Sequence, residues 1–187
     1  ESGHVLLEAD LSQVEGRLCF VYTGDPELIR LARLRSTEFD QHKFVASLVF
    51  RKAMDAVLKH ERQVSKSIGH GAQRGMRGFR LQETLLKEGY VFTVEECDAF
   101  IEAYHRAFPP IRVWHQSIRR EVRSTQGLVS SWGHVWDVSY FEINEDLFRK
   151  AYSWKMQRDC AGITNQMGFK PLWYWLQGRY EMYWNRQ

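Results

Sequence analysis

Residues 9–18, written ADLSQVEGRL, place a carboxylate, a hydroxyl, an amide, a second carboxylate and a guanidinium close together. They follow the apolar run His4–Leu7, so we predict a strand at His4–Ala9 that leads into a helix. Open sheets often bind ligands where a strand ends. At that position Asp10 has the chemistry to bind a hard cation such as Mg²⁺. The alternative is that Asp10 caps the N-terminus of the following helix.

A second group of residues combines regularly spaced basic side chains with an apolar face. Both kinds recur at every fourth position, two positions out of phase, so a helix presents them on roughly opposite faces. The basic set is Arg62, Lys66, His70 and Arg74, and the apolar set is Val64, Ile68, Ala72 and Met76. Like charges at this spacing repel, and no Asp or Glu lies between the first and last basic residue. The pattern predicts either a polyphosphate-binding face or an ordinary solvated one.

Helical periodicity dominates the remainder of the chain. An apolar stripe of Val14, Leu18 and Val21 predicts a first helix, which the turn at Thr23–Pro26 ends. Thr93 and Glu96 form a capping box before another helix. We also predict helices at about 26–34, 44–49, 57–75, 99–108, 111–124 and from 146 onward, and a hairpin at 127–136.

One of these helices carries a second run of basic residues, interleaved with aromatic ones. The run consists of Arg112, Trp114, His115, Arg119, Arg120 and Arg123. Such a pattern suits a helix that follows a nucleic-acid backbone. A solvated helix surface explains these arginines equally well.

Composition and charge limit the class of protein. The chain has 187 residues, 44% of them apolar, and a formal net charge of +3, as is typical of globular domains. The three cysteines lie far apart without a Cys-x-x-Cys pair, which favours a reducing compartment. No apolar run is long enough to cross a bilayer. We therefore expect a cytoplasmic protein with no membrane contact.

The two polar clusters together resemble family A DNA polymerases, the DNA polymerase I type. The first palm motif of that family reads Asp-Tyr-Ser-Gln-Ile-Glu-Leu-Arg, and residues 10–17 read Asp-Leu-Ser-Gln-Val-Glu-Gly-Arg. The similarity continues through Gly24–Ile29 and Asp40-Gln-His42. The fingers helix of the family follows Arg-x3-Lys-x7-Tyr-Gly, and Arg62, Lys66 and Gly75 stand at its matching positions.

The resemblance implies a right-hand polymerase with an α+β, predominantly helical fold. Residues 1–24 are then a partial palm with the first catalytic motif, and 25–126 are fingers helices with the nucleotide-binding helix near 60–76. Residues 127–187 form a hairpin and helices that return toward the palm. Fingers helices and part of the palm sheet are thus expected.

The resemblance also implies roles for the residues of the first cluster. Asp10 is expected to bind catalytic Mg²⁺, of which the complete enzyme uses two ions. Glu15 is expected to crowd a ribose 2′-hydroxyl and so to select deoxyribonucleotides. Gln13 is expected to touch primer and template, as are Arg158 and Gln166 near the other end of the chain.

The second cluster is expected to bind the incoming deoxynucleotide triphosphate. Arg62 and Lys66 are expected to grip its phosphates together with His42, which lies twenty residues before Arg62. His70 and Arg74 continue the same helix face and are assigned to nucleotide binding as well.

Three residues of this helix depart from the family pattern. His70 replaces an aromatic residue, Arg74 replaces Tyr, and Gly69 replaces Asn. Because the usual residues contact the nascent base pair, we expect altered nucleotide selection. In the family the Tyr hydroxyl holds the sugar-contacting Glu. We therefore predict an ion pair between Glu15 and Arg74, the alternative being that Arg74 points at solvent or a template phosphate.

A further departure concerns metal binding. A site for two ions needs at least two carboxylates, and the family takes its second from a His-Asp-Glu hairpin, a motif that this sequence lacks. Glu8 is a poor substitute, and the thumb expected upstream is missing too. We therefore expect a fragment of a longer or split polymerase that does not extend a primer alone. Its partners are then primer-template DNA, nucleotide, thumb and remaining palm.

Two other interpretations remain open. One is a non-catalytic module, derived from a polymerase, that binds nucleic acid or nucleotide. The departures at His70 and Arg74 favour it, whereas Asp10 and Lys66 argue against it. The other is an unrelated helical protein whose basic face meets an acidic protein, for which charge is the sole support.

Overall fold

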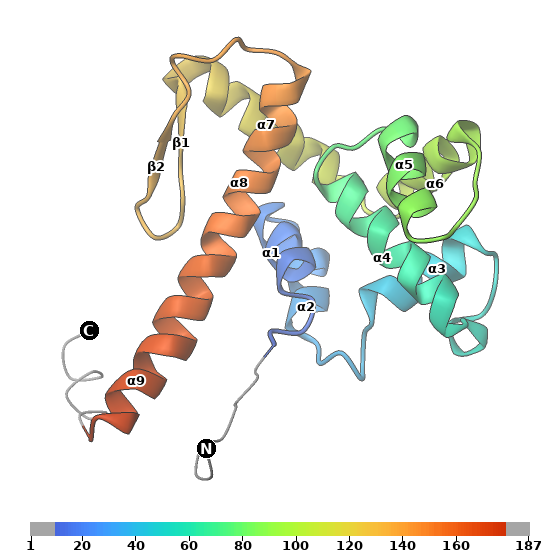
Figure 1. Ribbon diagram of the computed structural model, residues 1–187, viewed down its shortest axis with the longest axis horizontal. Helices are drawn as coiled ribbons and strands as arrows, with labels where there is room; N and C mark the ends of the chain where they lie inside the picture. The colour runs from blue at the N-terminus through green and yellow to red at the C-terminus, as the bar shows by residue number, and fades with distance from the viewer. Residues whose placement is uncertain (1–9, 179–187) are drawn as a thin grey trace.

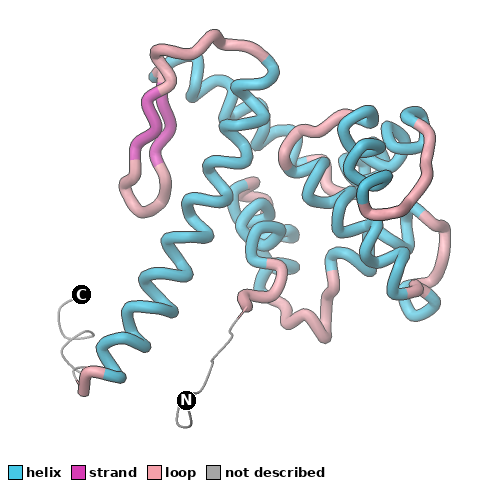
Figure 2. Tube along the Cα trace, in the orientation of Figure 1, coloured by secondary structure: helices cyan, strands magenta, loops and turns pink. Residues whose placement is uncertain are grey.

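The computed structural model describes residues 10–178, so the strand expected at His4–Ala9 lies outside the described part. Most of the described chain is helical, and one small antiparallel hairpin lies at its edge (Figures 1 and 2). The helices are α1 (Val14–Tyr22), α2 (Pro26–Arg33), α3 (Gln41–Val49), α4 (Lys59–Gln73), α5 (Gly78–Lys87), α6 (Val94–Ala107), α7 (Pro110–Thr125), α8 (Glu145–Ile163) and α9 (Lys170–Leu176). Short 3₁₀ and π-helical segments lie at Met54–Ala56 and Thr164–Phe169. The prediction of a predominantly helical α+β chain is confirmed.

Local sequence signals account for most of the element boundaries. Asp25 caps α2 by accepting a hydrogen bond from the Leu28 amide. The capping box of Thr93 and Glu96 opens α6, as predicted. Strands β1 (Gly127–Val129) and β2 (Val135–Asp137) form the expected hairpin, with Leu128 opposite Trp136. Helix α5 was not predicted.

The core contains the apolar face expected for α4 but not the one expected for α1. Val64, Ile68 and Ala72 are fully buried. In α1 the buried residues are instead Gly16, Cys19 and Phe20, and Val21 is 47% exposed. The predicted α1 stripe was wrong because α1 packs against several elements, α2, α4, α7 and α8, which together cover a different side of the helix.

The arrangement brings the start of α1 next to α4. Helix α4 packs against α3, α5, α6 and α1. Helix α8 runs as a long rod past α1, with α7 at one end and α9 at the other (Figure 1). Within the described part of the chain, no helix combines the length and the apolar character needed to cross a bilayer.

Candidate functional site

The turn that precedes α1 holds Asp10 at the surface. Gln13, not Asp10, is the N-cap residue of α1, and it has a left-handed backbone with φ of 55°. The capping alternative for Asp10 is therefore wrong. A non-glycine residue in this conformation is strained and requires support from its surroundings. Here the Gln13 side-chain oxygen accepts a hydrogen bond of 3.1 Å from the Gln41 amide at the start of α3.

Arg17 at the end of the first cluster has a structural role. Its guanidinium donates to the backbone carbonyls of Ala32 and Leu34, both at 2.6 Å, and to that of Ser12 at 3.0 Å. The C-terminal carbonyls of a helix lack intrahelical partners, so Arg17 satisfies the end of α2. It also ties this end to the turn that carries Asp10.

A cavity of about 360 Å³ unites most of the predicted site residues. Its wall comes from the turn and first residues of α1, from α3 and from α4. The polar residues that line it are Asp10, Ser12, Gln13, Glu15, His42, Arg62, Lys66 and His70. Asp10 and Lys66 thus face the same space, as the resemblance required.

Arg62 and Lys66 differ in how they meet this cavity. Arg62 donates through Nε to Asp40 at 2.8 Å, and its two terminal nitrogens make no hydrogen bond to the described residues, so they are available for an anion. Lys66 is exposed and forms no hydrogen bond or ion pair with the described residues. Asp40 also caps α3 through the amides of His42 and Lys43. No role was predicted for Asp40, although it lies in one of the segments that resemble the family.

Glu15 faces two basic side chains, His70 of α4 and Arg74 at the C-cap of this helix. Its Oε2 lies 2.5 Å from Nη2 of Arg74 and 3.5 Å from Nδ1 of His70. The ion pair predicted between Glu15 and Arg74 is therefore present. The contact with His70, together with the charge and hydrogen bond of Arg74, lowers the pKa of Glu15 to about 2, even though partial burial opposes this shift. Glu15 is consequently ionised at neutral pH.

These contacts correct the idea that the basic face lacks carboxylate partners. Because the sequence contains no acidic residue between Arg62 and Arg74, their charge appeared to be uncompensated. The fold supplies Asp40 and Glu15 from other elements. Of the four basic residues, Lys66 alone has no carboxylate partner among residues 10–178.

His42 is almost fully buried beside the cavity, at 6% exposure. Burial, reinforced by nearby positive charge, lowers the pKa of His42 to about 4. Its Nδ1 has no hydrogen-bond partner among the described residues. Its ring centroid lies 5.7 Å from that of His70. At neutral pH His42 is therefore an uncharged group with an unused polar atom.

Arg158 and Gln166 line a separate cavity of about 240 Å³, between the hairpin and α8. Trp132 at the hairpin turn lies against Gly162, where an added Cβ would fall 2.1 Å from the indole ring. The exposed Arg158 and the partly buried Gln166 are therefore not part of the Asp10 cavity. Trp132 was not predicted as part of a site, since contacts between a hairpin and a distant helix leave no local pattern in the sequence.

The described residues do not by themselves form a magnesium site. No group of three or more His, Cys, Asp or Glu side chains within residues 10–178 is arranged to hold a metal ion. Of the two acidic side chains that line the cavity, Glu15 is held by Arg74 and His70. Among residues 10–178, Asp10 is thus the one carboxylate on this cavity without a basic partner.

Comparison with known proteins gives consistent matches to polymerases. The model of DNA polymerase family A matches residues 1–163. The DNA polymerase of Bacillus phage SP01 is 36% identical over 123 residues, which cover 65% of this chain and 13% of the phage protein. The thermostable DNA polymerase I of Thermus aquaticus is 34% identical over 123 residues, or 66% of this chain and 14% of that protein. This chain thus spans a small part of their length.

A solved structure has the same fold. The POL domain of Pol1 from M. smegmatis, in complex with a DNA primer-template and dNTP, aligns with a TM-score of 0.68. The alignment covers 84% of this chain and 27% of that chain, at 23% sequence identity. The described helices and hairpin therefore have the arrangement found in part of a polymerase domain.

Proposed function

The chain belongs to DNA polymerase family A, and we propose that it supplies the deoxynucleotide-binding surface of a DNA-directed DNA polymerase. The reaction is attack of a primer 3′-hydroxyl on the α-phosphate of the nucleotide, with release of pyrophosphate. The observation that carries the proposal is the shared cavity of Asp10 and Lys66.

The residues of α4 and α3 bind the triphosphate in this proposal. Lys66 contributes a cation that no carboxylate of the described chain neutralises. Arg62 contributes its two free terminal nitrogens, while Asp40 holds its Nε in place. His42 offers an unpaired ring nitrogen beside them. Preorganised cations such as Lys66 and Arg62 neutralise the leaving phosphates without rearrangement during the reaction.

Asp10 is the carboxylate that we propose this chain contributes to a magnesium site. Family A polymerases use Mg²⁺, which stabilises charge on the entering and leaving oxygens when it is bound. Residues 10–178 offer one free carboxylate on the cavity. The remaining ligands would come from the rest of the polymerase, namely the remaining palm. We accordingly expect no primer extension by the chain alone.

Primer-template DNA is the proposed macromolecular partner. Arg158 and Gln166 would contact it at the cavity beside the hairpin. Gln13 is held by Gln41, so its contact with DNA would use the side-chain nitrogen. A third cavity, of about 580 Å³, lies between α5 and α8. Its wall combines Lys87 with a stacked Trp136–Trp154 pair, a basic and aromatic combination that suits single-stranded DNA, whereas Arg80 and Lys150 are paired with Glu83 and Asp146.

The proposed division of the chain follows from these roles. Residues 1–24 belong to a partial palm, 25–126 to the fingers, and 127–187 to the hairpin and helices that return toward the palm. The thumb and the remaining palm would be supplied by the rest of the enzyme.

The test is equilibrium binding of dATP to the chain by titration calorimetry, with and without Mg²⁺. We expect Mg²⁺-dependent binding that Lys66→Ala weakens about tenfold or more, because a charge-assisted contact to phosphate is lost. The matched control is Lys59→Ala. Lys59 is an exposed lysine of the same helix that does not line the cavity. Equal loss in both variants, or no binding to the unmodified chain, contradicts the proposal.

A non-catalytic binding module is the second candidate, because His70 and Arg74 depart from the family pattern. Both candidates predict nucleotide binding, so primer extension separates them. When the chain is joined to the rest of its polymerase, a catalytic role predicts that Asp10→Asn abolishes extension. If the chain is only a binding module, Asp10 takes no part in the reaction. Asp10→Asn should then leave the primer extension measured for the joined protein unchanged.

A further inference from the structure

We propose that Trp132, at the turn of the hairpin, is a further contact for primer-template DNA and that Asp159 holds it in place. Trp132 touches the DNA itself in this scheme, whereas Asp159 is a positioning residue that acts through the turn. The inference rests on the proposed function, since it adds residues to the cavity of Arg158 and Gln166.

Trp132 forms part of the wall of this cavity. The hairpin lies along α8 (Figure 1), and the indole ring of Trp132 packs against Gly162, one turn of α8 after Arg158. A Cβ at position 162 would overlap the indole ring, so only glycine lets the ring approach the helix this closely. Trp132 nevertheless remains 39% exposed, so part of its surface is available to a ligand in the cavity.

The cavity joins basic and aromatic side chains without an acidic one. Arg158 and Lys170 supply positive charge, Trp132 and Phe169 supply rings, and none of the described residues that line the cavity is Asp or Glu. A cation beside an exposed ring suits a DNA strand, because the cation neutralises a phosphate and the ring packs against a base or sugar. Trp132 therefore suits the strand that Arg158 contacts.

Asp159 fixes the turn that carries Trp132. Asp159 is almost fully buried, at 1% exposure, and its carboxylate accepts hydrogen bonds from the Ser131 amide at 2.8 Å and from the Ser131 hydroxyl at 2.6 Å. It also accepts a hydrogen bond from the hydroxyl of Tyr22 in α1. Hydrogen bonds to a carboxylate are among the stronger polar contacts in proteins. Because Ser131 directly precedes Trp132, these bonds set where the indole ring lies on α8.

Other contacts hold the strands of the hairpin independently of the turn. Lys155 of α8 donates through Nζ to the Val129 carbonyl in β1. Trp136 of β2 stacks on Trp154 of α8. The strands therefore stay attached to α8 when the bonds to Asp159 are lost, and the turn alone is released.

The experiment uses fluorescence anisotropy to measure the dissociation constant of a fluorescein-labelled primer annealed to a longer template. We expect Trp132→Ala to raise this constant about tenfold, because packing on the ring is lost. Trp132→Phe keeps a ring and should recover part of the affinity. The control is Tyr140→Ala, because Tyr140 follows the same hairpin, is 91% exposed and does not line the cavity. This control should leave the constant unchanged.

Asp159→Asn tests the positioning role. Removal of a negative charge near DNA should by itself strengthen binding, so a dissociation constant raised about fivefold indicates that the turn has moved. Asp137→Asn makes the same change of charge at the exposed end of β2 and should not weaken binding. Ser131→Ala is a milder variant that removes one of the same hydrogen bonds, and it should weaken binding in the same direction.

A double-mutant cycle and one further variant separate the possible outcomes. In the Trp132→Ala background, Asp159→Asn should add no further weakening, because Asp159 acts through Trp132. An undiminished effect in that background overturns the positioning role. An unchanged dissociation constant in Trp132→Ala overturns the inference, and a loss of affinity in Arg158→Ala at the same time leaves the proposed function standing. If the unmodified chain does not bind the DNA, the proposed function fails as well. Circular dichroism checks that each variant keeps its helices.

Discussion

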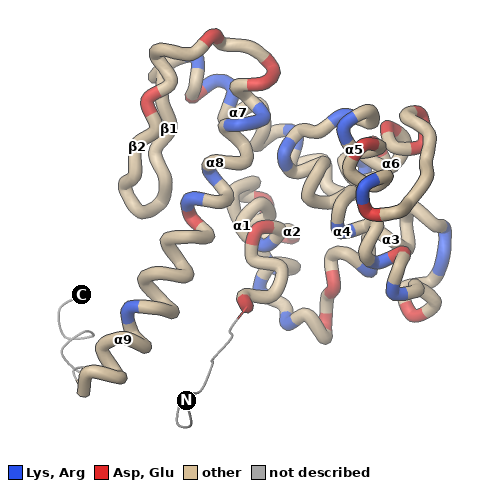
Figure 3. Tube along the Cα trace, in the orientation of Figure 1, with Lys and Arg blue, Asp and Glu red and all other residues tan. Residues whose placement is uncertain are grey.

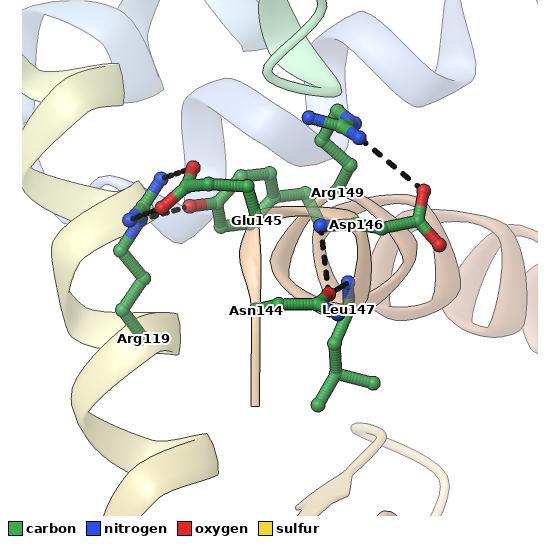
Figure 4. A network of polar contacts seen from close by, with 7 residues as sticks. Arg119, Asn144, Glu145, Asp146, Leu147 and Arg149 are labelled. Carbon is green, nitrogen blue, oxygen red and sulfur yellow. Dashed lines mark hydrogen bonds and ion pairs between the residues drawn. The ribbon is translucent and has the colours of Figure 1, made fainter. Parts of the chain in front are cut away.

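Helices α4 and α7 both carry several basic side chains (Figure 3), yet the fold uses them differently. On α4, Lys66 and the free nitrogens of Arg62 face a cavity. On α7, Arg119 donates to Glu145 through both terminal nitrogens at 2.6 Å and to the Tyr152 hydroxyl at 2.7 Å. Figure 4 shows Arg119 directed at Glu145 beside the residues that open α8.

Two of the other three arginines of α7 also contact the protein itself. Arg112 pairs with Glu102, and the guanidinium of Arg123 lies 4.8 Å from the ring centroid of Phe148. Arg120 remains exposed. Because these side chains already contact the protein, they give little support to the expectation that this run follows a nucleic-acid backbone. The difference shows that the availability of a cation for a ligand depends on acidic and aromatic partners brought by other elements.

The largest effect is expected for Gly75→Ala, which tests how the end of α4 packs against α8. Gly75 ends α4 with φ of 68°, and an added Cβ would lie 2.8 Å from the Tyr152 ring. We expect a loss of about 3 kcal/mol in free energy of unfolding, from backbone strain together with overpacking. Urea denaturation measures this loss.

Gly24→Ala is the matched control for this substitution. Gly24 has φ of 70° and no atom within 4 Å of an added Cβ, so it should lose about 1 kcal/mol from backbone strain alone. Equal losses in the two variants would mean that the contact between Gly75 and Tyr152 does not constrain the end of α4.

Arg119→Ala tests whether the α7 arginines serve stability. We expect a loss of about 2 kcal/mol in free energy of unfolding, because hydrogen bonds to Glu145 and Tyr152 and packing over Phe148 disappear together. Nucleotide affinity should stay unchanged, in contrast to Lys66→Ala. A loss of dATP affinity without a loss of stability would mean that Arg119 contributes to nucleotide binding and not to the stability of the fold.

The local features of both helices were predictable from the sequence, but their partners on other elements were not. The four-residue spacing correctly predicted the buried side of α4 at Val64, Ile68 and Ala72. Glycine, proline and capping residues correctly indicated α2, α6 and the hairpin. These signals act within a few residues, so the sequence reveals them directly. Helix α5 was missed, because no capping residue marks its N-terminus.

The candidate site was predictable only where a family motif linked distant segments. Spacing alone does not bring Asp10 near Lys66, and the motif supplied that expectation. The motif also made Arg74 stand out opposite Glu15. In contrast, the partners Asp40 for Arg62 and Glu145 for Arg119 depend on how separate helices pack. Charge patterns within one helix therefore overestimate the positive charge that is free to bind a ligand.

A third test uses pH, because His115 on α7 contacts α4. Its Nε2 lies 2.8 Å from the Gln73 carbonyl oxygen, and burial lowers the pKa of His115 to about 4. In the unfolded chain the pKa is near the ordinary 6.5. The unfolded state thus binds the proton first, and stability present above pH 6.5 is lost as pH falls toward 4. We expect His115 to account for about 1 to 2 kcal/mol of this loss.

Urea denaturation at several pH values measures the effect of His115. His42 and His105 also have pKa values lowered to about 4, so the unmodified chain should lose stability from more than one group. His115→Gln keeps a donor for the Gln73 carbonyl but cannot titrate, and its stability should therefore depend less steeply on pH. An identical pH dependence in both proteins would show that His115 does not remain neutral in the folded state.

The smallest effect is expected for Arg112→Ala. It compares a solvent-exposed ion pair of α7 with the contacts of Arg119 on the same helix. Arg112 and Glu102 form an ion pair of 2.5 Å, a separation close to those of Arg119 and Glu145, but their side chains are 51% and 46% exposed. Water and salt screen such a pair, so we expect a loss below about 0.5 kcal/mol in free energy of unfolding. Urea denaturation at low and high salt measures it, with Arg119→Ala alongside. If Arg112→Ala cost as much as Arg119→Ala, the contacts of Arg119 with Tyr152 and Phe148 would not account for its contribution, and proximity to a carboxylate alone would explain both.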